Sequence, residues 1–404
     1  MKFFPLIKKG AMLVLATFVL LSCNEQTTTE ETAYGTPAPN LEEVSVSPLS
    51  PKEQDALDEF ESWLDTSFVE FGPPGLAVAV LKGNEVVMEK TFGVLDVETQ
   101  QSVQPNSVFR LASVSKGFAP VLTGILVQEG CLHWDDLVAA YLPDFALNDP
   151  AATKQLSLRH VLSHTTGLPR HTYSNLLNMN VPYQEILPVL KEVELSHPVG
   201  TWYNYQNVAY SLIGDVIEQA TGMSYGEALA ERIFQILGME GASTSHGAIA
   251  GCQNTAMPHG PDAEGYHRIA LRDKFYSVGP AAGVNANLED MEEWLRLLMG
   301  YRPDVIDSTA LQALFQPQAD VAPIEGVMRA WRPMDVSAYG MGWRLVEKDQ
   351  KHYVFHGGFV NGYRSEIGFC QEQGLGIVLL SNGSSRFVGD ALPHFFSLQR
   401  KGGA

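Results

Sequence analysis

The chain has 404 residues and a formal net charge of −19, with 45% hydrophobic and 18% charged residues. This composition is typical of a folded globular protein and argues against a disordered one. A negative charge of this size repels nucleic-acid phosphates, so we expect no nucleic-acid partner. The length is sufficient for two lobes and a large core.

The N-terminal 22 residues have the features of an export signal. Three lysines precede an apolar stretch over residues 11–21, which is too short to span a bilayer as a helix. The sequence LLSC at residues 20–23 resembles a bacterial lipobox and predicts lipidation of Cys23. An ordinary signal peptide over residues 1–22 is the alternative. Residues 23–51 are rich in Thr, Glu, Pro and Ser and predict a flexible tether.

These features predict a lipoprotein of the cell envelope. In a diderm bacterium we expect it on the periplasmic or outer-membrane side, in contact with the membrane only through its lipid. Besides Cys23, the cysteines are Cys131, Cys252 and Cys370, so at most one disulfide can form if Cys23 carries lipid. Their spacing matches no metal site.

The periodicity of the apolar residues after the tether predicts strands near both ends of the folded part and helices between them. An amphipathic helix precedes two strands that a short Lys-Gly-Asn turn joins as a hairpin. In chain order we expect helix 57–68, strands 76–81 and 85–92, helices 118–129, 208–221 and 225–237, strands 353–356, 365–369 and 374–381, and helix 387–398.

This order predicts an α/β fold, in which an antiparallel sheet is flanked by the terminal helices and an all-α lobe is inserted. We expect the folded domain to cover residues 52–398. Its α/β lobe would comprise residues 52–117 and 276–398, and its helical lobe residues 118–275. A cleft between the two lobes is a natural place for a functional site.

Ser113 and Lys116 form the first candidate catalytic pair. Among the lysines of the chain, only Lys116 has a serine three positions before it. Ser113 is expected to open the helix that follows, so the two side chains would share one face beside free backbone N–H groups. Lysine can activate a serine if its pKa falls from about 10.4 toward about 7–8. A helix-capping serine beside a surface lysine is the alternative.

Two Tyr-x-Asn triplets are candidates for the next part of the site. Tyr173 and Asn175 lie in a loop that leads into no clear helix. Tyr205 and Asn207 lie between a turn and a predicted helix, which positions side chains better, so we prefer this pair. Tyr205 can relay a proton between Ser113 and a leaving group. Asn207 can orient the lysine and bind the substrate, whereas a core tyrosine is the alternative for Tyr205.

The third element is the sequence HGGF at residues 356–359, which ends a predicted strand. Paired glycines allow a ligand to approach the backbone closely. A backbone N–H in this segment can join that of Ser113 in an oxyanion hole, where one donor changes the rate about 10²–10³-fold. A β-bulge with a packed His356 is the alternative.

Taken together, these segments resemble the serine β-lactamase-related family of class C β-lactamases, DD-peptidases, D-aminopeptidases and family VIII-type esterases. The resemblance covers roughly residues 52–398. It also decides between the two Tyr-x-Asn triplets, in favour of the second. The segments that carry it are FRLASVSK (109–116), WDDLV (134–138), YLP (141–143), RHVLSHTTGLP (159–169), YQN (205–207), YSLIG (210–214) and HGG (356–358).

The resemblance implies a role for each candidate residue. Ser113 would be the nucleophile, and Lys116 with Tyr205 the base and proton relay. Asn207 would contact the lysine and the substrate. The N–H groups of Ser113 and Phe359 would form the oxyanion hole, and the substrate would lie along His356, Gly358 and Phe359. The implied substrate is a small-molecule or peptide acyl compound, with no cofactor and no metal, and His160 and His164 would be structural.

Two departures from the family pattern bear on specificity. His356 and Gly357 stand where the family's Lys-Thr-Gly motif has lysine and threonine, which weakens the usual site for a substrate carboxylate. We therefore expect short esters or D-aminoacyl amides to react better than cephalosporins. Arg364 is the nearby residue that can restore a carboxylate site, although a surface ion pair of Arg364 with Glu366 is the favoured alternative.

A catalytically silent lipoprotein that binds or senses penicillin-like compounds is the rival function. The retained Ser113, Lys116 and Tyr205 argue against it.

Overall fold

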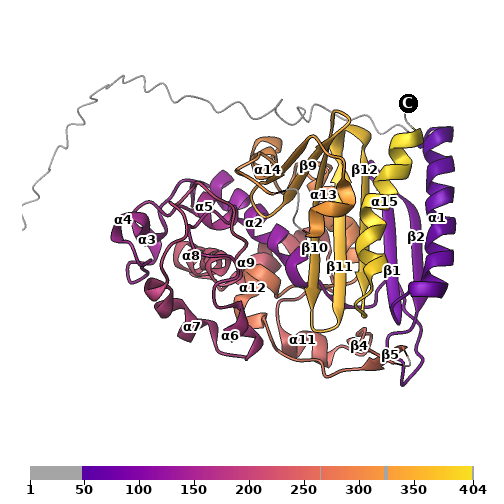
Figure 1. The fold of residues 1–404 in the computed structure, drawn as a ribbon, viewed down its shortest axis with the longest axis horizontal. Helices are drawn as coiled ribbons and strands as arrows, with labels where there is room; N and C mark the ends of the chain where they lie inside the picture. The colour runs from indigo at the N-terminus through magenta and orange to yellow at the C-terminus, as the bar shows by residue number, and fades with distance from the viewer. Residues whose placement is uncertain (1–47, 264, 323–325, 403–404) are drawn as a thin grey trace, which may run out of the picture. The chain divides into compact units, whose positions relative to one another are not determined.

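An eight-stranded antiparallel sheet, in the order β2-β1-β12-β11-β10-β9-β8-β7, organises the fold. The computed structural model describes residues 48–263, 265–322 and 326–402 (Figure 1). The first two strands come from the start of the described chain and the other six from its end, which confirms the expected fold class. The strands are β1 (Gly75–Lys82), β2 (Glu85–Gly93), β7 (Ala319–Asp320), β8 (Val336–Tyr339), β9 (Arg344–Lys348), β10 (Lys351–Val360), β11 (Tyr363–Cys370) and β12 (Leu375–Ser381).

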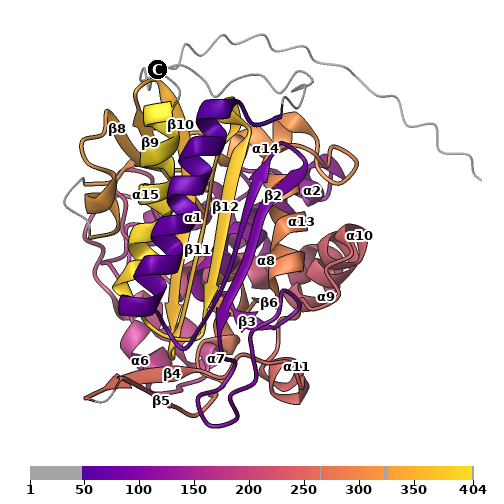
Figure 2. The same ribbon diagram turned by 90° about the vertical axis from the view of Figure 1, so that its right-hand side faces the viewer.

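Helices α1 (Pro51–Phe71) and α15 (Arg386–Gly402) cover one face of the sheet and lie side by side (Figure 2). Helix α1 starts with a capping box, in which Ser50 and Glu53 satisfy each other's backbone N–H groups. Its apolar stripe includes Phe60, which is fully buried and lies 5.1 Å, between ring centroids, from Phe395 of α15. The expected terminal helices are therefore both present.

The other face of the sheet packs against helices that link it to a mostly helical part of the molecule (Figure 1). Phe118 at the start of α2 stacks on Trp294 of α13 with 3.9 Å between ring centroids. The linking helices are α2 (Phe118–Gln128), α12 (Gly279–Ala282), α13 (Leu288–Leu298) and α14 (Ser308–Leu314). The helical part contains α3 (Val138–Tyr141), α4 (Pro150–Thr153), α5 (Leu158–Leu162), α6 (Ser174–Asn178), α7 (Tyr183–Ile186), α8 (Leu212–Thr221), α9 (Tyr225–Leu229), α10 (Gln235–Leu237) and α11 (His246–Gly251).

Several elements of the helical part differ from the expected long helices. The first turn of the helix expected at 208–221 is a 3₁₀ turn, η3 (Ala209–Ser211), and the helix expected at 225–237 contains a π-helical segment, Ala230–Phe234. Two short antiparallel pairs were not predicted, β4 (His259–Asp262) with β5 (Gly265–Arg268) and β3 (Phe109–Arg110) with β6 (Asn285–Ala286). These strands have only two or four residues, too few to give a clear alternation of apolar side chains. The boundaries that we expect for the two lobes stay a prediction.

The expected signal segment, Cys23 and nearly all of the tether lie outside the described residues. Helix α1 begins at Pro51, the last residue assigned to the tether. Within the described ranges, no helix combines the length and the apolar content that a membrane span requires.

Candidate active site

Ser113 lies in a 3₁₀ turn, η1 (Ala112–Gly117), that runs directly into α2. We expected Ser113 to open the α-helix itself. In a 3₁₀ turn, however, residues i and i+3 are eclipsed, so Ser113 and Lys116 still lie on one face. Ala112 has a φ of 48°, a left-handed conformation that costs energy for alanine and is typical of functional turns.

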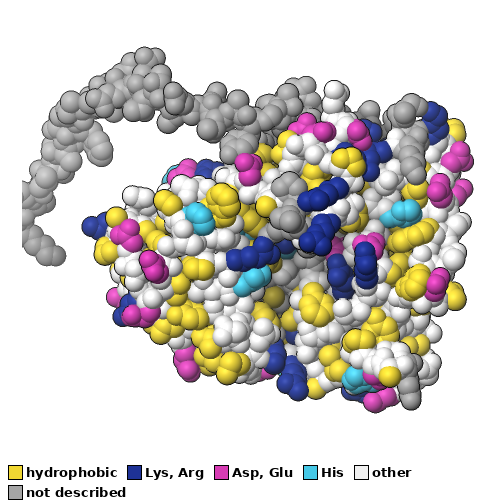
Figure 3. Space-filling model, viewed as in Figure 1, with side chains coloured by type: hydrophobic (Ala, Val, Ile, Leu, Met, Phe, Trp, Pro, Cys, Tyr) yellow, Lys and Arg dark blue, Asp and Glu magenta, His cyan; other side chains and the backbone are white. Residues whose placement is uncertain are grey.

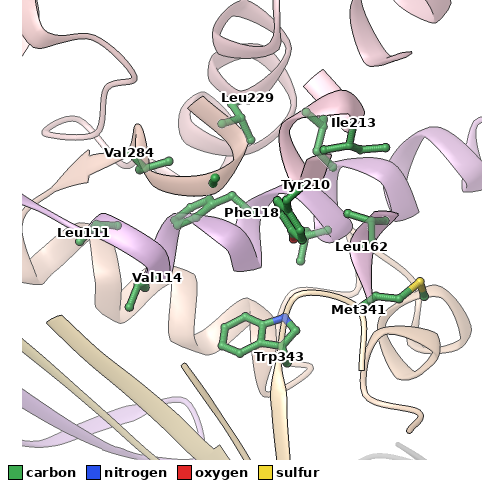
Figure 4. Packing of buried hydrophobic residues seen from close by; sticks show 14 of the residues in the cluster. Leu111, Val114, Phe118, Leu162, Tyr210, Ile213, Leu229, Val284, Met341 and Trp343 are labelled. Atoms are coloured by element: carbon green, nitrogen blue, oxygen red, sulfur yellow. The ribbon is translucent and has the colours of Figure 1, made fainter. Parts of the chain in front are cut away.

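Three separate elements fix this turn. The Ser365 hydroxyl of β11 donates to the carbonyl of Leu111 at 2.5 Å, and the Tyr210 hydroxyl donates to the carbonyl of Lys116 at 2.7 Å. The N–H of Leu111 donates to the carbonyl of Val284 at 3.0 Å. Figure 4 shows the apolar packing around the turn, where Phe118, Tyr210 and Trp343 belong to one cluster of buried residues. The turn is therefore held from the sheet and from the helical part.

The structure distinguishes between the two serines of the motif. Ser113 is half-buried, so its hydroxyl retains access to solvent. Ser115 is fully buried, and its oxygen accepts a hydrogen bond from the N–H of Val284 at 3.0 Å. Of the two serines, Ser113 is therefore the one that solvent reaches.

Lys116 is fully buried, and its amine is held by protein acceptors. Its Nζ donates to Oδ1 of Asn207 at 2.8 Å and to the carbonyl of Ala281 at 3.0 Å. It lies 4.6 Å from the centroid of the Tyr205 ring. Burial lowers the pKa of Lys116, although Tyr205 opposes this change. The direction of the shift is the one that a catalytic lysine requires.

Tyr205 is buried beside both members of the pair. The side chains of Ser113 and Lys116 both act on its phenol and lower its pKa. Burial raises the pKa of Tyr205, but the positive charges of Lys116 and Arg344 outweigh burial, and the net pKa is lowered. A lowered pKa increases the fraction of the phenol that is ionised at neutral pH, and only the ionised form can accept a proton.

Of the two Tyr-x-Asn triplets, only the second reaches Lys116. Asn207 accepts from Lys116 and donates through Nδ2 to the hydroxyl of Ser174 at 3.3 Å. In the other triplet, the Tyr173 hydroxyl donates to the carbonyl of Val189, and Asn175 is exposed. The preference for Tyr205 and Asn207 therefore agrees with the geometry.

Strand β10 passes directly beside the nucleophile turn. It pairs with β11 as far as Val360 but with β9 only as far as Phe355, so residues 356–360 form a free edge on the β9 side. A Cβ atom added to Gly358 would lie 2.4 Å from the Leu111 carbonyl oxygen and 2.9 Å from the backbone nitrogen of Ser113. The absence of a Cβ atom at Gly358 thus allows β10 to lie this close to the nucleophile turn. The side chain of Phe359 is 61% exposed at the same edge.

His356 differs from the expected substrate contact. Its ring is fully buried, with Nε2 at 3.2 Å from both the Tyr339 hydroxyl and a terminal nitrogen of Arg344. Because arginine only donates, Nε2 must accept, so Nδ1 carries the proton and donates to the carbonyl of Gly357 at 2.9 Å. Burial and the charges of Arg344 and Lys116 hold the pKa of His356 well below its ordinary range. In this conformation the ring is neutral and both its nitrogens have protein partners, so it does not contact a substrate.

The suggestion that Arg364 restores a carboxylate site is wrong. Arg364 lies on the α15 side of the sheet, because a Cβ atom added to Gly389 of α15 would lie 2.1 Å from its guanidinium. Its neighbour Ser365 faces the nucleophile turn instead. The alternative ion pair is confirmed, with 2.8 Å between Arg364 and Glu366. It is partly buried rather than on the surface, and burial raises the pKa of Glu366 to about 7.

Sequence reasoning missed Arg344 and the aromatic residues around it. Arg344 is buried, and its Cζ lies 5.6 Å from the centroid of the Tyr205 ring. Its only signal in the sequence is a charge within the apolar segment MGWRLV (341–346). His164, expected to be structural, is fully buried with 4.5 Å between its ring centroid and that of Tyr205.

The described part of the chain offers no group of three His, Cys, Asp or Glu side chains that would hold a metal ion. Cys131, Cys252 and Cys370 all carry free thiols.

A model of the beta-lactamase family matches residues 64–395, a range that contains every candidate residue of the site. The chain belongs to the beta-lactamase family. It is similar to two solved structures of the same fold. The octameric penicillin-binding protein homologue from Pyrococcus abyssi has a TM-score of 0.73 at 22% identity, covering 85% of this chain and 77% of that one. SurE has a TM-score of 0.71 at 21% identity, covering 87% and 77%.

Two curated relatives are similar to this chain over only part of their own length. Protein flp of Staphylococcus aureus (strain MRSA252) is 25% identical over 327 residues, which cover 80% of this chain and 62% of that protein. The unguisins hydrolase ungD′ of Aspergillus campestris is 26% identical over 361 residues, which cover 85% and 64%. The chain thus spans less than two thirds of either relative.

Proposed function

We propose that the protein is a serine hydrolase that forms an acyl-enzyme on Ser113 and transfers the acyl group to water. One observation carries this proposal: Ser113 and the buried Lys116 amine both act on the buried phenol of Tyr205, and Asn207 and Ala281 hold that amine 4.6 Å from the Tyr205 ring centroid. A serine hydroxyl becomes a nucleophile only beside a base. Lys116 and Tyr205 are both shifted in pKa toward that role.

In the acylation step, the Ser113 oxygen attacks the carbonyl carbon of the substrate while its proton moves to the Tyr205 oxygen. The bond to the leaving group then breaks, and Tyr205 passes the proton to that group. The N–H groups of Ser113 and Phe359 stabilise the negative oxygen of the intermediate. In deacylation, water gives a proton to the same base and attacks the acyl carbon, after which the proton returns to Ser113.

The walls of the site favour a small acyl substrate without a carboxylate beside the scissile bond. His356 is neutral and buried, Gly357 has no hydroxyl, and Arg364 faces α15. On strands β10 and β11, which are fully described, none of these three positions offers a charge to a substrate carboxylate beside Ser113. Short esters and D-aminoacyl amides are therefore the substrate class that we propose, ahead of cephalosporins.

Exposed cations around the site can attract a charged substrate from farther away than residues beside Ser113 can. Figure 3 shows Lys and Arg side chains gathered near the middle of the face where the helical part meets the sheet, although the chain carries a net charge of −19. Arg170 is one exposed cation that acts electrostatically on His171 and Tyr203. Such charges attract anions across about 8–10 Å of solvent but are screened by salt. They affect encounter rather than fix a carboxylate beside Ser113.

The test is kcat/KM for p-nitrophenyl esters, D-alanyl p-nitroanilide and nitrocefin, in the parent and in Ser113→Ala. We expect measurable ester or amide turnover in the parent, and none above background in Ser113→Ala. Ser115→Ala is the matched control, since it removes a buried hydroxyl from the same turn and should keep the activity. Nitrocefin turnover about a hundredfold above ester turnover would contradict the substrate class. A parent that turns over no substrate, yet binds penicillin, would instead favour the non-catalytic rival.

A further inference from the structure

Arg344 is a buried cation that lacks a carboxylate of its own as an ion-pair partner. It is 6% exposed, and its Nε atom has no hydrogen-bond partner among the described residues. Buried arginines are ordinarily paired with a carboxylate. The carboxylate that acts on Arg344 is Glu366, but its Oε1 accepts two hydrogen bonds from Arg364. A structural ion pair therefore does not account for Arg344.

The guanidinium points instead toward the catalytic cluster. One terminal nitrogen lies 3.2 Å from Nε2 of His356, and Cζ lies 5.6 Å from the centroid of the Tyr205 ring. Arg344 opens β9, directly opposite Phe355, and β10 becomes a free edge beyond that residue. Arg344 thus lies at the last pair between β9 and β10, where the edge of β10 that runs beside Ser113 becomes free. A neutral His356 orients the guanidinium by accepting its hydrogen bond.

The other groups around Tyr205 do not balance this charge. The permanent cation Arg344 and the amine of Lys116, whose pKa burial lowers, flank the phenol. Burial together with neighbouring cations holds the pKa of His164 and of His356 well below the ordinary range. Glu366, the carboxylate that acts on Arg344, is bound to Arg364. The titratable and charged groups that face Tyr205 or Arg344 are Lys116, His164, Arg170, His171, Tyr203, Tyr210, Tyr339, His356 and Glu366.

We infer that Arg344 is a positioning residue that supplies the permanent positive charge missing at His356 and stabilises the proton-accepting, anionic form of Tyr205. The inference rests on the proposed function, because it assigns Tyr205 the role of proton acceptor. Arg344 itself neither gains nor loses a proton in the reaction. The proton leaves Ser113 for the Tyr205 oxygen as the bond from Ser113 to the acyl carbon forms. The guanidinium stabilises the negative charge on that oxygen before the transfer.

The experiment compares the pH profiles of ester kcat/KM in the parent, Arg344→Gln, Arg344→Lys and Arg364→Gln. Activity requires the anion of Tyr205, so it is lost as the pH falls through the pKa of that group. In Arg344→Gln we expect the acidic limb to move up by about one to two pH units, since a charge at this distance is removed. Arg344→Lys keeps a cation and should restore most of the shift. Arg364→Gln, on the other face, should leave the limb in place.

A purely structural role would give a different result. If Arg344→Gln lowers the activity equally at every pH, or if its acidic limb coincides with that of the parent, the inference is overturned. A second measurement does not depend on the folding of Arg344→Gln. Ultraviolet titration of Ser113→Ala should show one tyrosine ionising below the ordinary value of about 10, and this signal should vanish in the Ser113→Ala, Tyr205→Phe double variant. The absence of such a tyrosine also overturns the inference.

These outcomes are separable from those that test the proposed function. If a fluorophosphonate labels Ser113 in the parent but the acidic limb of the pH profile stays in place when Arg344 is replaced, only the role proposed for Arg344 is contradicted. If Ser113 is never labelled and no ester is hydrolysed, the proposed function fails first.

Discussion

At the scale of single residues, the site is defined by an excess of buried positive charge around one phenol. Lys116 and Arg344 approach Tyr205 from different elements, with 4.6 Å and 5.6 Å from the charged groups to the ring centroid. Burial alone would keep the phenol protonated. Lys116 and Arg344 oppose this effect and contribute to the lowered pKa of Tyr205. For this reason Tyr205 rather than a histidine accepts the proton of Ser113 in our proposal.

Replacing Tyr205 by phenylalanine tests this assignment. General acid–base groups contribute about 10²–10⁴ in rate, so Tyr205→Phe should lower kcat/KM for an ester by that factor with little change in folding. Tyr173→Phe is the control, because it removes the hydroxyl of the other Tyr-x-Asn triplet. Equal losses in both variants, or full activity in Tyr205→Phe, would be incompatible with the role of Tyr205.

Glu366 gives a prediction about stability and pH. Burial raises its pKa from 4.5 to about 7. Between these values the folded state binds more protons at Glu366 than the unfolded state does, so the contribution of this group to stability falls by about 3 kcal/mol as the pH rises through this range. Glu366→Gln removes this dependence. In urea unfolding from pH 4.5 to 8, its free energy of unfolding relative to the parent should increase up to pH 7, and a constant difference would contradict the prediction.

Some of these residues could be predicted from the sequence and others could not. Ser113 and Lys116 share one turn, so their spacing suggested the pair but left a helix-capping serine as the alternative. For Tyr205 and Asn207, the turn and helix beside them gave a preference between two triplets, and the family resemblance decided it. Arg344 meets His356 only because β9 and β10 pair in one register. No local pattern encodes that register, and it also determines the proton position on His356.

At the scale of elements, the site depends on how closely β10 approaches the turn η1. Gly358 faces the Leu111 carbonyl and the Ser113 nitrogen, while Ser365 on the next strand binds the same carbonyl. This contact aligns the free edge of β10 with Ser113, as an oxyanion hole between the two N–H groups requires.

A methyl group at Gly358 should separate the two elements. A Cβ atom would lie 2.4 Å from the Leu111 carbonyl oxygen, so Gly358→Ala must shift β10 or the turn. We expect kcat/KM to fall about 10²–10³-fold, the value of one oxyanion donor, and stability to fall by about 1–3 kcal/mol. Gly251→Ala, where nothing lies within 4 Å of the added atom, is the control. Parent-like acylation in Gly358→Ala would mean that the close approach is not needed.

The regular elements were easier to predict than the turns. Strands β1 and β12 are nearly continuous apolar runs buried on both faces, and α1 and α15 carry clear apolar stripes. The 3₁₀ form of η1 depends instead on hydrogen bonds from β11 and from Tyr210. These partners are distant in sequence, so the local pattern favoured a plain helix start.

At the scale of the whole molecule, we propose that the catalytic domain is held at the cell envelope by a lipid on Cys23. The proposal rests on the lipobox-like sequence and the polar segment after it. In a bacterial host, the parent should fractionate with membranes, and Cys23→Ser should appear as a soluble or uncleaved form. Ester hydrolysis should be the same in both forms, because Cys23 is remote in sequence from every site residue. A mature-sized Cys23→Ser protein that stays with the membranes would exclude the anchor.

The central claim is that Ser113 forms the acyl-enzyme, and peptide mass spectrometry after reaction with a fluorophosphonate tests it most directly. Ser113 is half-buried beside Tyr205, whereas the hydroxyl of Ser115 is buried and accepts from Val284. We predict one adduct per chain, on Ser113, which is lost in Ser113→Ala and retained in Ser115→Ala. An adduct on Ser115, or no adduct with either a fluorophosphonate or a penicillin while the protein remains folded, would contradict the account.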